Sequence, residues 1–358
     1  MEPAAASEVV LFIPDISGFT KFVAETEINH SQHIIRELLE ILVDSNSIGL
    51  KISEIEGDAI LFFRPGAPPS AAEFVEQARK MFVNFHTQLK RYELQRLCQC
   101  GACTSASQLT LKIVAHRGPA STVRIRDHTK LIGKDVIVAH RLLKNSLQQR
   151  EYLLLTRDLL AGLKESNGGL EAFADGADSY DEIGAVEYRY LSLTKYREEV
   201  KAEKPEPFTV KNPHKVMELS QRIDAPAERV YQTLIDLPGR MNWIEGIKRV
   251  ELHDGKPNQL GTKHRCVRDP TDPEIVTGDV KVTDTTFEFW ETDVKKLVSL
   301  KYSVRRASAD ASELIVEFFV RGNILVRAIF SVLLKRKMKI GFEKSLKNLA
   351  VFCGQRAH

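Results

Sequence analysis

Two aspartates have the spacing and surroundings of a metal or phosphate site. Asp15 ends the apolar, strand-like stretch LFIPD, and Ser17 and Gly18 follow it where a helix is predicted to begin. Asp58 follows Gly57 in a turn between the strand-like stretches KISEIE and AILFF, which is a hairpin pattern. Free backbone N–H groups at a helix start favour phosphate, and carboxylate oxygens suit Mg²⁺ or Mn²⁺ when phosphates complete the coordination. We therefore expect Asp15 and Asp58 to be metal ligands.

The elements that must position these aspartates alternate between strand and helix. Apolar residues at helical spacing predict helices over residues 19–46, 68–85 and 133–146, and alternation predicts a strand over 108–116 that Gly118-Pro119 ends. The resulting order, β-α-β-β-α-β-α-β, predicts an α+β domain whose sheet is covered by helices on one face.

Four motifs occur in an order that resembles a known family. They are DISGFT at Asp15, EIEGDAILFF at Glu54, VAHRGPA at Val114 and IGKDVIVAHRL at Ile132. Together they resemble the class III adenylyl and guanylyl cyclase catalytic domain. The resemblance implies a ferredoxin-like fold, a homodimer with composite sites, and two Mg²⁺ or Mn²⁺ ions held by Asp15 and Asp58. In that chemistry the ribose 3′-hydroxyl attacks the α-phosphorus and expels pyrophosphate.

The resemblance also indicates which residues contact the purine. Glu54 lies four residues before Asp58, and Lys130 lies three before Gly133, at the two positions that read the base in the family. A carboxylate accepts hydrogen bonds from the N1–H and amino donors of guanine, so Glu54 predicts that the protein binds GTP in preference to ATP. Lys130 departs from the Asp or Cys of the family. The alternative is that Glu54 is a solvent-facing strand residue.

The helix after Gly133 departs from the family at one position. The family carries Asn and, four residues later, Arg; this chain has Ile137 and Arg141. Arg141 is the expected phosphate-clamping catalytic residue. Ile137 cannot donate a hydrogen bond to ribose, and losing such a donor costs roughly two to three orders of magnitude in rate. We therefore expect cyclase activity to be weak or lost.

The cluster CQCGAC contains a second set of ligand-type residues. Cys98, Cys100 and Cys103, with His116 after them, would suit a tetrahedral zinc ion. No second cysteine pair lies beside them, so a loop of small thiols in a reducing cell explains the cluster equally well.

Composition restricts the classes of protein. The 358 residues predict about two domains. A net charge of +3 does not imply nucleic acid. The chain has five cysteines, an odd number, which favours free thiols over a disulfide framework. Its start lacks signal-peptide features, and no apolar run is long enough to span a bilayer. These features predict a cytoplasmic protein.

The second half of the chain follows a charged, proline-containing stretch. We expect a first domain over residues 1–193, a linker over 194–213 and a second domain over 214–358. In the second domain, seven short strands and a long helix over residues 323–352 accompany the stretch RIDAPAERVYQTLIDLPGR. This stretch resembles the START-like superfamily that includes polyketide cyclases, which implies a helix-grip fold and binding of a hydrophobic small molecule or lipid. Trp243, Phe287, Phe289 and Trp290 would line or fill its interior.

A basic run follows the apolar start of the last helix. Lys335, Arg336, Lys337 and Lys339 could meet an anionic membrane surface, although such a run is more often the solvated face of a terminal helix.

The sequence thus predicts a cyclase-like domain that binds purine nucleotide and metal, coupled to an apolar-ligand domain, as a cytoplasmic sensor. Two alternatives remain open: an active guanylyl-type cyclase, and a lipid carrier whose first domain only dimerises.

Overall fold

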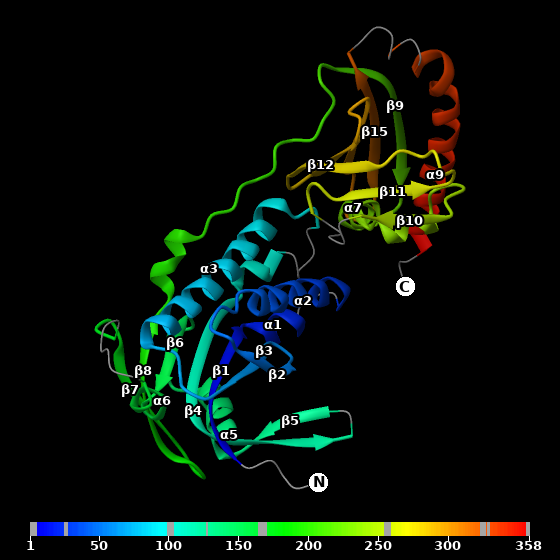
Figure 1. The fold of residues 1–358 in the computed structure, drawn as a ribbon. Helices are drawn as coiled ribbons and strands as arrows, with labels where there is room; N and C mark the ends of the chain where they lie inside the picture. Colours follow the sequence, from blue (N-terminus) through cyan, green and yellow to red (C-terminus); the bar gives the residue numbers. More distant parts are fainter. Residues whose placement is uncertain are drawn as a thin grey trace. The chain divides into compact units, whose positions relative to one another are not determined.

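The chain folds into two compact units. The computed structural model describes residues 6–24, 28–98, 104–126, 128–163, 170–253, 259–322, 327 and 330–355. One unit comprises Met1–Glu93 and Gly101–Ala202, and the other comprises Leu94–Cys100 and Glu203–His358. Each unit is built on its own sheet, with helices packed against it (Figure 1). The predicted α+β class is confirmed.

The described part of the first unit contains a mixed sheet of eight strands. Its order is β2-β3-β1-β4-β6-β8-β7, with β5 paired to β4, and only β4 and β6 run parallel. The strands are β1 (Ser7–Ser17), β2 (Lys51–Glu56), β3 (Ala59–Pro65), β4 (Thr110–Ile125), β5 (His128–Ile132), β6 (Tyr152–Thr156), β7 (Ala174–Tyr180) and β8 (Gly184–Ser192). The helices are α1 (Phe19–Ala24), α2 (Ile28–Asp44), α3 (Ala71–Gln95), α5 (Lys134–Arg141) and α6 (Arg157–Ala161). The single helix expected over residues 19–46 is therefore two helices.

Strand β1 is buried on both faces. Phe12 stacks on Phe74 of α3, with ring centroids 6.3 Å apart. On the opposite face, Leu11 and Ile13 belong to an apolar cluster with residues of α5. The prediction that helices cover only one face is thus wrong. An apolar run without alternation, as in residues 9–13, is what a strand covered on both faces requires.

Strand β4 continues through Gly118-Pro119, where the sequence predicted its end. Opposite β1 the ladder is unbroken, but β6 pairs only with residues 113–115 and β5 only from Ser121 onward. Pro119, which has no N–H, therefore has a strand neighbour on one side only, and a proline is tolerated there. A Cβ atom on Gly118 would lie 2.2 Å from Cγ of Asp135, so glycine leaves room for a side chain of α5.

The second unit contains an antiparallel sheet of seven strands in its described part. Its order is β10-β11-β12-β13-β14-β15-β9. The strands are β9 (Pro213–Ile223), β10 (Arg249–Leu252), β11 (Lys263–Val267), β12 (Ile275–Val282), β13 (Thr286–Asp293), β14 (Val298–Arg306) and β15 (Ser312–Arg321). Helix α7 (Ala227–Ile235) precedes β10, and α9 (Lys335–Gln355) packs along β9 (Figure 1). This sheet with a long C-terminal helix is the predicted helix-grip arrangement.

The expected interior aromatics mostly fill the core of this unit. Phe287 stacks on Tyr231 at 5.0 Å, and Phe289 stacks on Tyr302 at 4.6 Å. Trp243 is also buried, whereas Trp290 is only partly covered. The final helix differs from its prediction, because Phe330–Leu334 is a π-helical turn and the α-helix begins at Lys335. Among the described helices, none combines the length and the apolar character needed to cross a bilayer.

Candidate functional site

The fold brings Asp15 and Asp58 to adjacent positions. Asp15 lies near the end of β1 opposite Ala59 of β3, and the backbone N–H of Ile16 donates to the carbonyl of Asp58 at 3.0 Å. Gly57, with φ of +60°, forms the tight turn that returns the chain into β3. Asp15, near the end of β1, and Asp58, in the turn before β3, thus lie at the same end of two neighbouring strands.

Both carboxylates bind protons more readily than usual. Burial is the main cause of the raised pKa of Asp15; Lys112 opposes this shift and the charge of Asp58 adds to it. The pKa of Asp58 is raised as well, again mainly by burial. Two neighbouring carboxylates that are held away from water favour a cation between them. Their electrostatics therefore suit a metal ion.

Lys112 of β4 is the functional neighbour that the sequence analysis missed. It pairs with Asp15 in the β1–β4 ladder, and its Nζ lies 3.3 Å from Asp15 Oδ1 while donating to the carbonyl of Leu143 at 2.7 Å. A single lysine among the apolar residues of a central strand is the signal that could have identified it. Lys112 partly neutralises the aspartate pair.

The two predicted purine-contacting residues form an ion pair. Lys130 Nζ lies 2.9 Å from Glu54 Oε2 and 3.5 Å from Glu56 Oε1. His140 Nε2 lies 3.9 Å from the other oxygen of Glu54, although no role was expected for this histidine. Glu54 is only about one-sixth exposed, at 17%. The pair combines an acceptor on β2 and a donor on β5, two strands that are not paired with each other in the sheet.

Helix α5 supplies the remaining predicted residues. Ile137 and Arg141 both point into solvent-accessible space, and the side chain of Ile137 is 56% exposed. The position where the cyclase family has Asn is therefore accessible but cannot hydrogen-bond.

All these residues line one cleft of about 1130 Å³ in the first unit. Its charged residues are Lys21, Lys112, Lys130, Arg141 and Lys144 on the basic side and Asp15, Glu54, Glu56 and Asp58 on the acidic side. The lining of a single chain thus contains both the aspartate pair and the α5 positions. A mixed set of cations and carboxylates can accept a phosphate-bearing ligand together with a metal.

The metal hypotheses differ in their support. In the described ranges, no group of three or more His, Cys, Asp or Glu side chains is arranged to hold a metal ion, and Asp15 and Asp58 are a pair of carboxylates. The thiol of Cys98 donates to Gln232 Oε1 at 3.1 Å. Both ring nitrogens of His116 are engaged, with Thr156 and Asp135. Because Cys100 and Cys103 lie outside the described residues, the zinc site stays a prediction.

The interior of the second unit contains a compensated charge cluster. Arg240 Nη2 lies 2.6 Å from Glu291 Oε1, and His264 Nε2 lies 3.5 Å from the same oxygen. Arg240 also donates twice to the carbonyl of Leu234, at 3.1 and 2.8 Å. Burial would raise the pKa of Glu291, but Arg240 and His264 outweigh it and lower the pKa. The cluster joins the end of α7 to β11 and β13.

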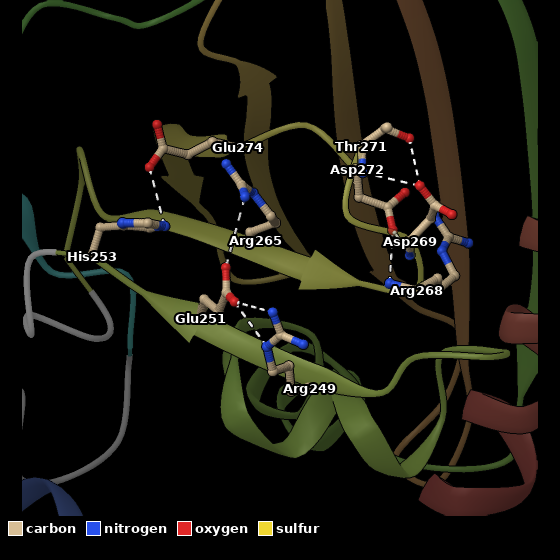
Figure 2. Close-up of polar contacts among 9 residues, drawn as sticks. All are labelled: Arg249, Glu251, His253, Arg265, Arg268, Asp269, Thr271, Asp272 and Glu274. Atoms are coloured by element: carbon tan, nitrogen blue, oxygen red, sulfur yellow. Dashed lines mark hydrogen bonds and ion pairs between the residues drawn. The ribbon is translucent and has the colours of Figure 1, made fainter.

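The outer strands of this sheet carry an exposed polar network, which Figure 2 shows. Arg249 donates to Glu251 within β10, at 2.8 and 2.6 Å, and His253 Nε2 lies 3.4 Å from Glu274. In the turn after β11, Asp269 and Asp272 accept from neighbouring backbone and hydroxyl groups. These contacts are local, so the network stabilises strand ends and turns.

Two known families match the sequence. A family described as proteins of unknown function (DUF2652) matches residues 35–152, and the family described as polyketide cyclase / dehydrase and lipid transport matches residues 214–351. Uncharacterized protein Rv2561/Rv2562 of Mycobacterium tuberculosis is 33% identical over 157 residues, which make up 44% of this chain and 72% of that protein. The START-like domain inferred from the sequence is thus confirmed as a family match.

Solved structures with a similar fold are class III cyclase catalytic domains. The guanylyl cyclase Cya2 is 16% identical and covers 54% of this chain and 100% of its own, with a TM-score of 0.40. A bacterial light-regulated adenylyl cyclase is 18% identical, covering 56% and 58%, with a TM-score of 0.41. The guanylyl cyclase domain of the RhoGC fusion protein of Blastocladiella emersonii is 19% identical, covering 53% and 98%, with a TM-score of 0.36.

Proposed function

Because the chain belongs to the DUF2652 family of proteins of unknown function, joined here to a polyketide cyclase / lipid transport domain, we propose that it senses two ligands. The first unit would bind a purine nucleoside triphosphate with Mg²⁺ or Mn²⁺. The second would bind a small apolar molecule. The observation that supports the first assignment most strongly is the single cleft lined by Asp15, Glu54, Asp58, Lys130 and Arg141.

The donor set of the cleft fits a hard divalent ion. Mg²⁺ is commonly held by one or two carboxylates, with water and substrate phosphates as the other ligands. Asp15 and Asp58 supply two such carboxylates, and their raised pKa values mark them as groups that lack a full counter-charge. The bound ion would neutralise the phosphates, while Arg141 and Lys144 at the same cleft would hold their outer oxygens.

The ion pair between Glu54 and Lys130 supports guanine over adenine. Guanine presents an O6 acceptor beside N1–H and amino donors on one edge. A lysine can donate to O6 while a carboxylate accepts from the donors. Adenine presents one amino donor beside an unprotonated N1 acceptor, so the carboxylate of Glu54 finds two neighbouring donors on guanine and only one on adenine.

Turnover is expected to be weak or absent. Ile137 places an apolar side chain at the position where a hydrogen-bond donor would orient ribose. Nucleotide binding therefore serves a conformational output in this proposal. Antiparallel homodimerisation through the first unit, as in the cyclase family, is part of the same proposal.

The second unit has a buried polar atom that suits a ligand with one polar end. Trp243 Nε1 is buried and has no hydrogen-bond partner within the described residues. A buried donor or acceptor without a partner costs about 1 to 3 kcal/mol, which a ligand hydroxyl or carbonyl would recover. A ligand bound there that alters nucleotide affinity would link the two units by reciprocal coupling.

The test is equilibrium binding of GTP and ATP to the full-length protein in the presence of Mn²⁺. Asp15→Asn and Asp58→Asn should each weaken GTP binding at least about tenfold, because each removes a metal ligand. Asp181→Asn, an exposed aspartate outside the cleft, is the matched control and should leave binding unchanged. The double change Glu54→Ala and Lys130→Ala should remove the preference for GTP.

Three outcomes separate the hypotheses. Binding without cyclic product supports the sensor. Mn²⁺-dependent cyclic product that both aspartate variants abolish supports the active cyclase. If neither nucleotide binds, and lipid is retained on purification, the proposal for the first unit is wrong and the carrier is supported.

A further inference from the structure

The π-helical turn Phe330–Leu334 and the start of α9 expose both apolar and basic side chains. Val332 is 80% exposed, Ile340 50% and Leu334 41%. The side chains from Leu334 to Lys337 are all exposed, although a helix that packs on a sheet normally buries one stripe. Within the described part of α9, the buried residues begin only at Ser345. In the first two turns of α9 the side chains of Lys335, Arg336, Lys337, Lys339 and Ile340 are thus exposed, whereas Phe342 packs against Phe318 of β15 with ring centroids 4.8 Å apart.

The same region is strongly basic. From Gly322 to Phe342 the sequence has five Lys or Arg residues and neither Asp nor Glu. In the described ranges the ion pairs include one from this stretch, between Lys339 and Glu343 at 3.8 Å, and none from Lys335, Arg336 or Lys337. These three charges have no intramolecular counter-charge at salt-bridge distance within those ranges.

Near Lys337 lies a turn that carries charges of both signs. The pKa of Asp269 is lowered, first by hydrogen bonds from Thr271 and then by the nearby charges of Lys248 and Lys337. Lys337 therefore lies near the turn after β11, where Arg268 is also found (Figure 2). The carboxylates of this turn are already engaged, because Asp272 accepts from two backbone N–H groups and Asp269 from Thr271. Both carboxylates keep their negative charge, so the positive charge of the surface comes mainly from Lys335, Arg336, Lys337 and Lys339.

We propose that Val332, Leu334–Lys337, Lys339 and Ile340, here called the α9 patch, dock the second unit onto a membrane that contains anionic lipids. Apolar side chains ringed by Lys and Arg match the boundary between headgroups and acyl chains, where the amines meet phosphate and the apolar groups leave water. A nucleic acid would use the charges but would leave the apolar side chains exposed. The patch lies outside the nucleotide cleft, so this proposal is independent of the function of the first unit.

The experiment is co-sedimentation of the full-length protein with vesicles of phosphatidylcholine alone or mixed with phosphatidylglycerol. Binding should require phosphatidylglycerol and weaken as salt is raised. Each basic residue near an anionic surface contributes about fivefold in affinity, so neutralising Lys335, Arg336 and Lys337 to Gln should weaken binding about 100-fold. The matched control neutralises three exposed basic residues elsewhere in this unit, Lys281, Lys295 and Arg305, and should change affinity no more than about twofold.

A second variant tests the apolar part of the patch. Val332→Asp changes a side chain that is 80% exposed, so the fold should tolerate it, while binding to the mixed vesicles should fall about tenfold or more. Equal binding to neutral vesicles, or binding that the Lys335, Arg336 and Lys337 change leaves intact, contradicts the proposal. Vesicle-free self-association that the same changes abolish would show instead that the patch contacts a second copy of the chain.

Discussion

The cleft of the first unit and the interior of the second both hold carboxylates away from water, but the pKa values of these carboxylates shift in opposite directions. In the cleft, Asp15 and Asp58 have raised pKa values because burial exceeds the compensation from Lys112. In the interior, Glu291 has a lowered pKa because Arg240 and His264 outweigh its burial. Uncompensated charge costs folding free energy, and a protein retains it where a ligand supplies the compensation. Compensated charge maintains the fold.

The largest effect should come from breaking the interior cluster. Glu291→Gln leaves the buried guanidinium of Arg240 without its counter-charge, which typically costs about 3 to 5 kcal/mol. Urea denaturation would measure the loss. Glu288→Gln on the same strand is the matched control, since Glu288 forms a partly exposed pair with Lys301 and should cost less than about 1 kcal/mol. Equal costs for the two variants would contradict a structural role for the cluster.

The pH dependence of stability should have opposite signs for two acids of the first unit. Burial alone would raise the pKa of Glu151, but His86 and Arg197 lower it to about 2. Its stabilising effect is therefore complete above its ordinary pKa of 4.5 and disappears as pH falls towards 2. At neutral pH the free energy of unfolding of the wild type should exceed that of Glu151→Gln by about 2 kcal/mol. This difference should vanish as the pH falls from 4.5 towards 2.

Asp15→Asn should behave in the opposite way. Because the pKa of Asp15 is raised above 3.8, the folded state binds its proton more tightly, and the charged form lowers stability as pH rises above that value. The variant should be more stable than wild type at neutral pH, and this advantage should shrink as pH falls towards 3.8. Thermal melts across this pH range would measure the stability of both variants relative to wild type. If the stability difference changed with pH in the same direction for Glu151→Gln and Asp15→Asn, the distinction between the two acids would be refuted.

Removing Lys112 should leave the charge of Asp15 and Asp58 even less compensated. Lys112→Met deletes the ammonium group 3.3 Å from Asp15 Oδ1 and should tighten Mn²⁺ binding in the absence of nucleotide about tenfold, because this ammonium repels the metal ion and competes with it for the carboxylate. Isothermal titration would measure the change. Lys144→Met, at an exposed position of the same cleft, should alter the affinity no more than about twofold. A weaker Mn²⁺ affinity in Lys112→Met would show that Lys112 organises the site.

The sequence predicted most of the second unit, because its strands alternate regularly and are separated by turn residues. It failed for β4, where Gly118-Pro119 looked like a break. The strand continues because its partner β1 pairs across both residues, and this is tertiary information that no local pattern contains. It also missed β5, a short strand whose main partner is the second half of β4.

The site was predictable to the extent that its residues follow a motif. Asp15, Glu54, Asp58, Lys130 and Arg141 do meet in one cleft. The contact between Lys112 and Asp15 could not be predicted, because it depends on the register of β1 against β4. The 80% exposure of Val332, in the π-helical turn before α9, was also unexpected, because an apolar side chain in a helix that packs on a sheet is normally buried.

The central claim is that the cleft carboxylates lack a counter-charge that a metal nucleotide supplies. It is tested most directly by titrating Mn²⁺ into the full-length protein with GTP present and following free Mn²⁺ by electron paramagnetic resonance. The account predicts that wild type removes Mn²⁺ from solution in a GTP-dependent manner and that Asp58→Asn does not, while remaining as stable as wild type or more so. Equal uptake by the two proteins, or none by either, would contradict it.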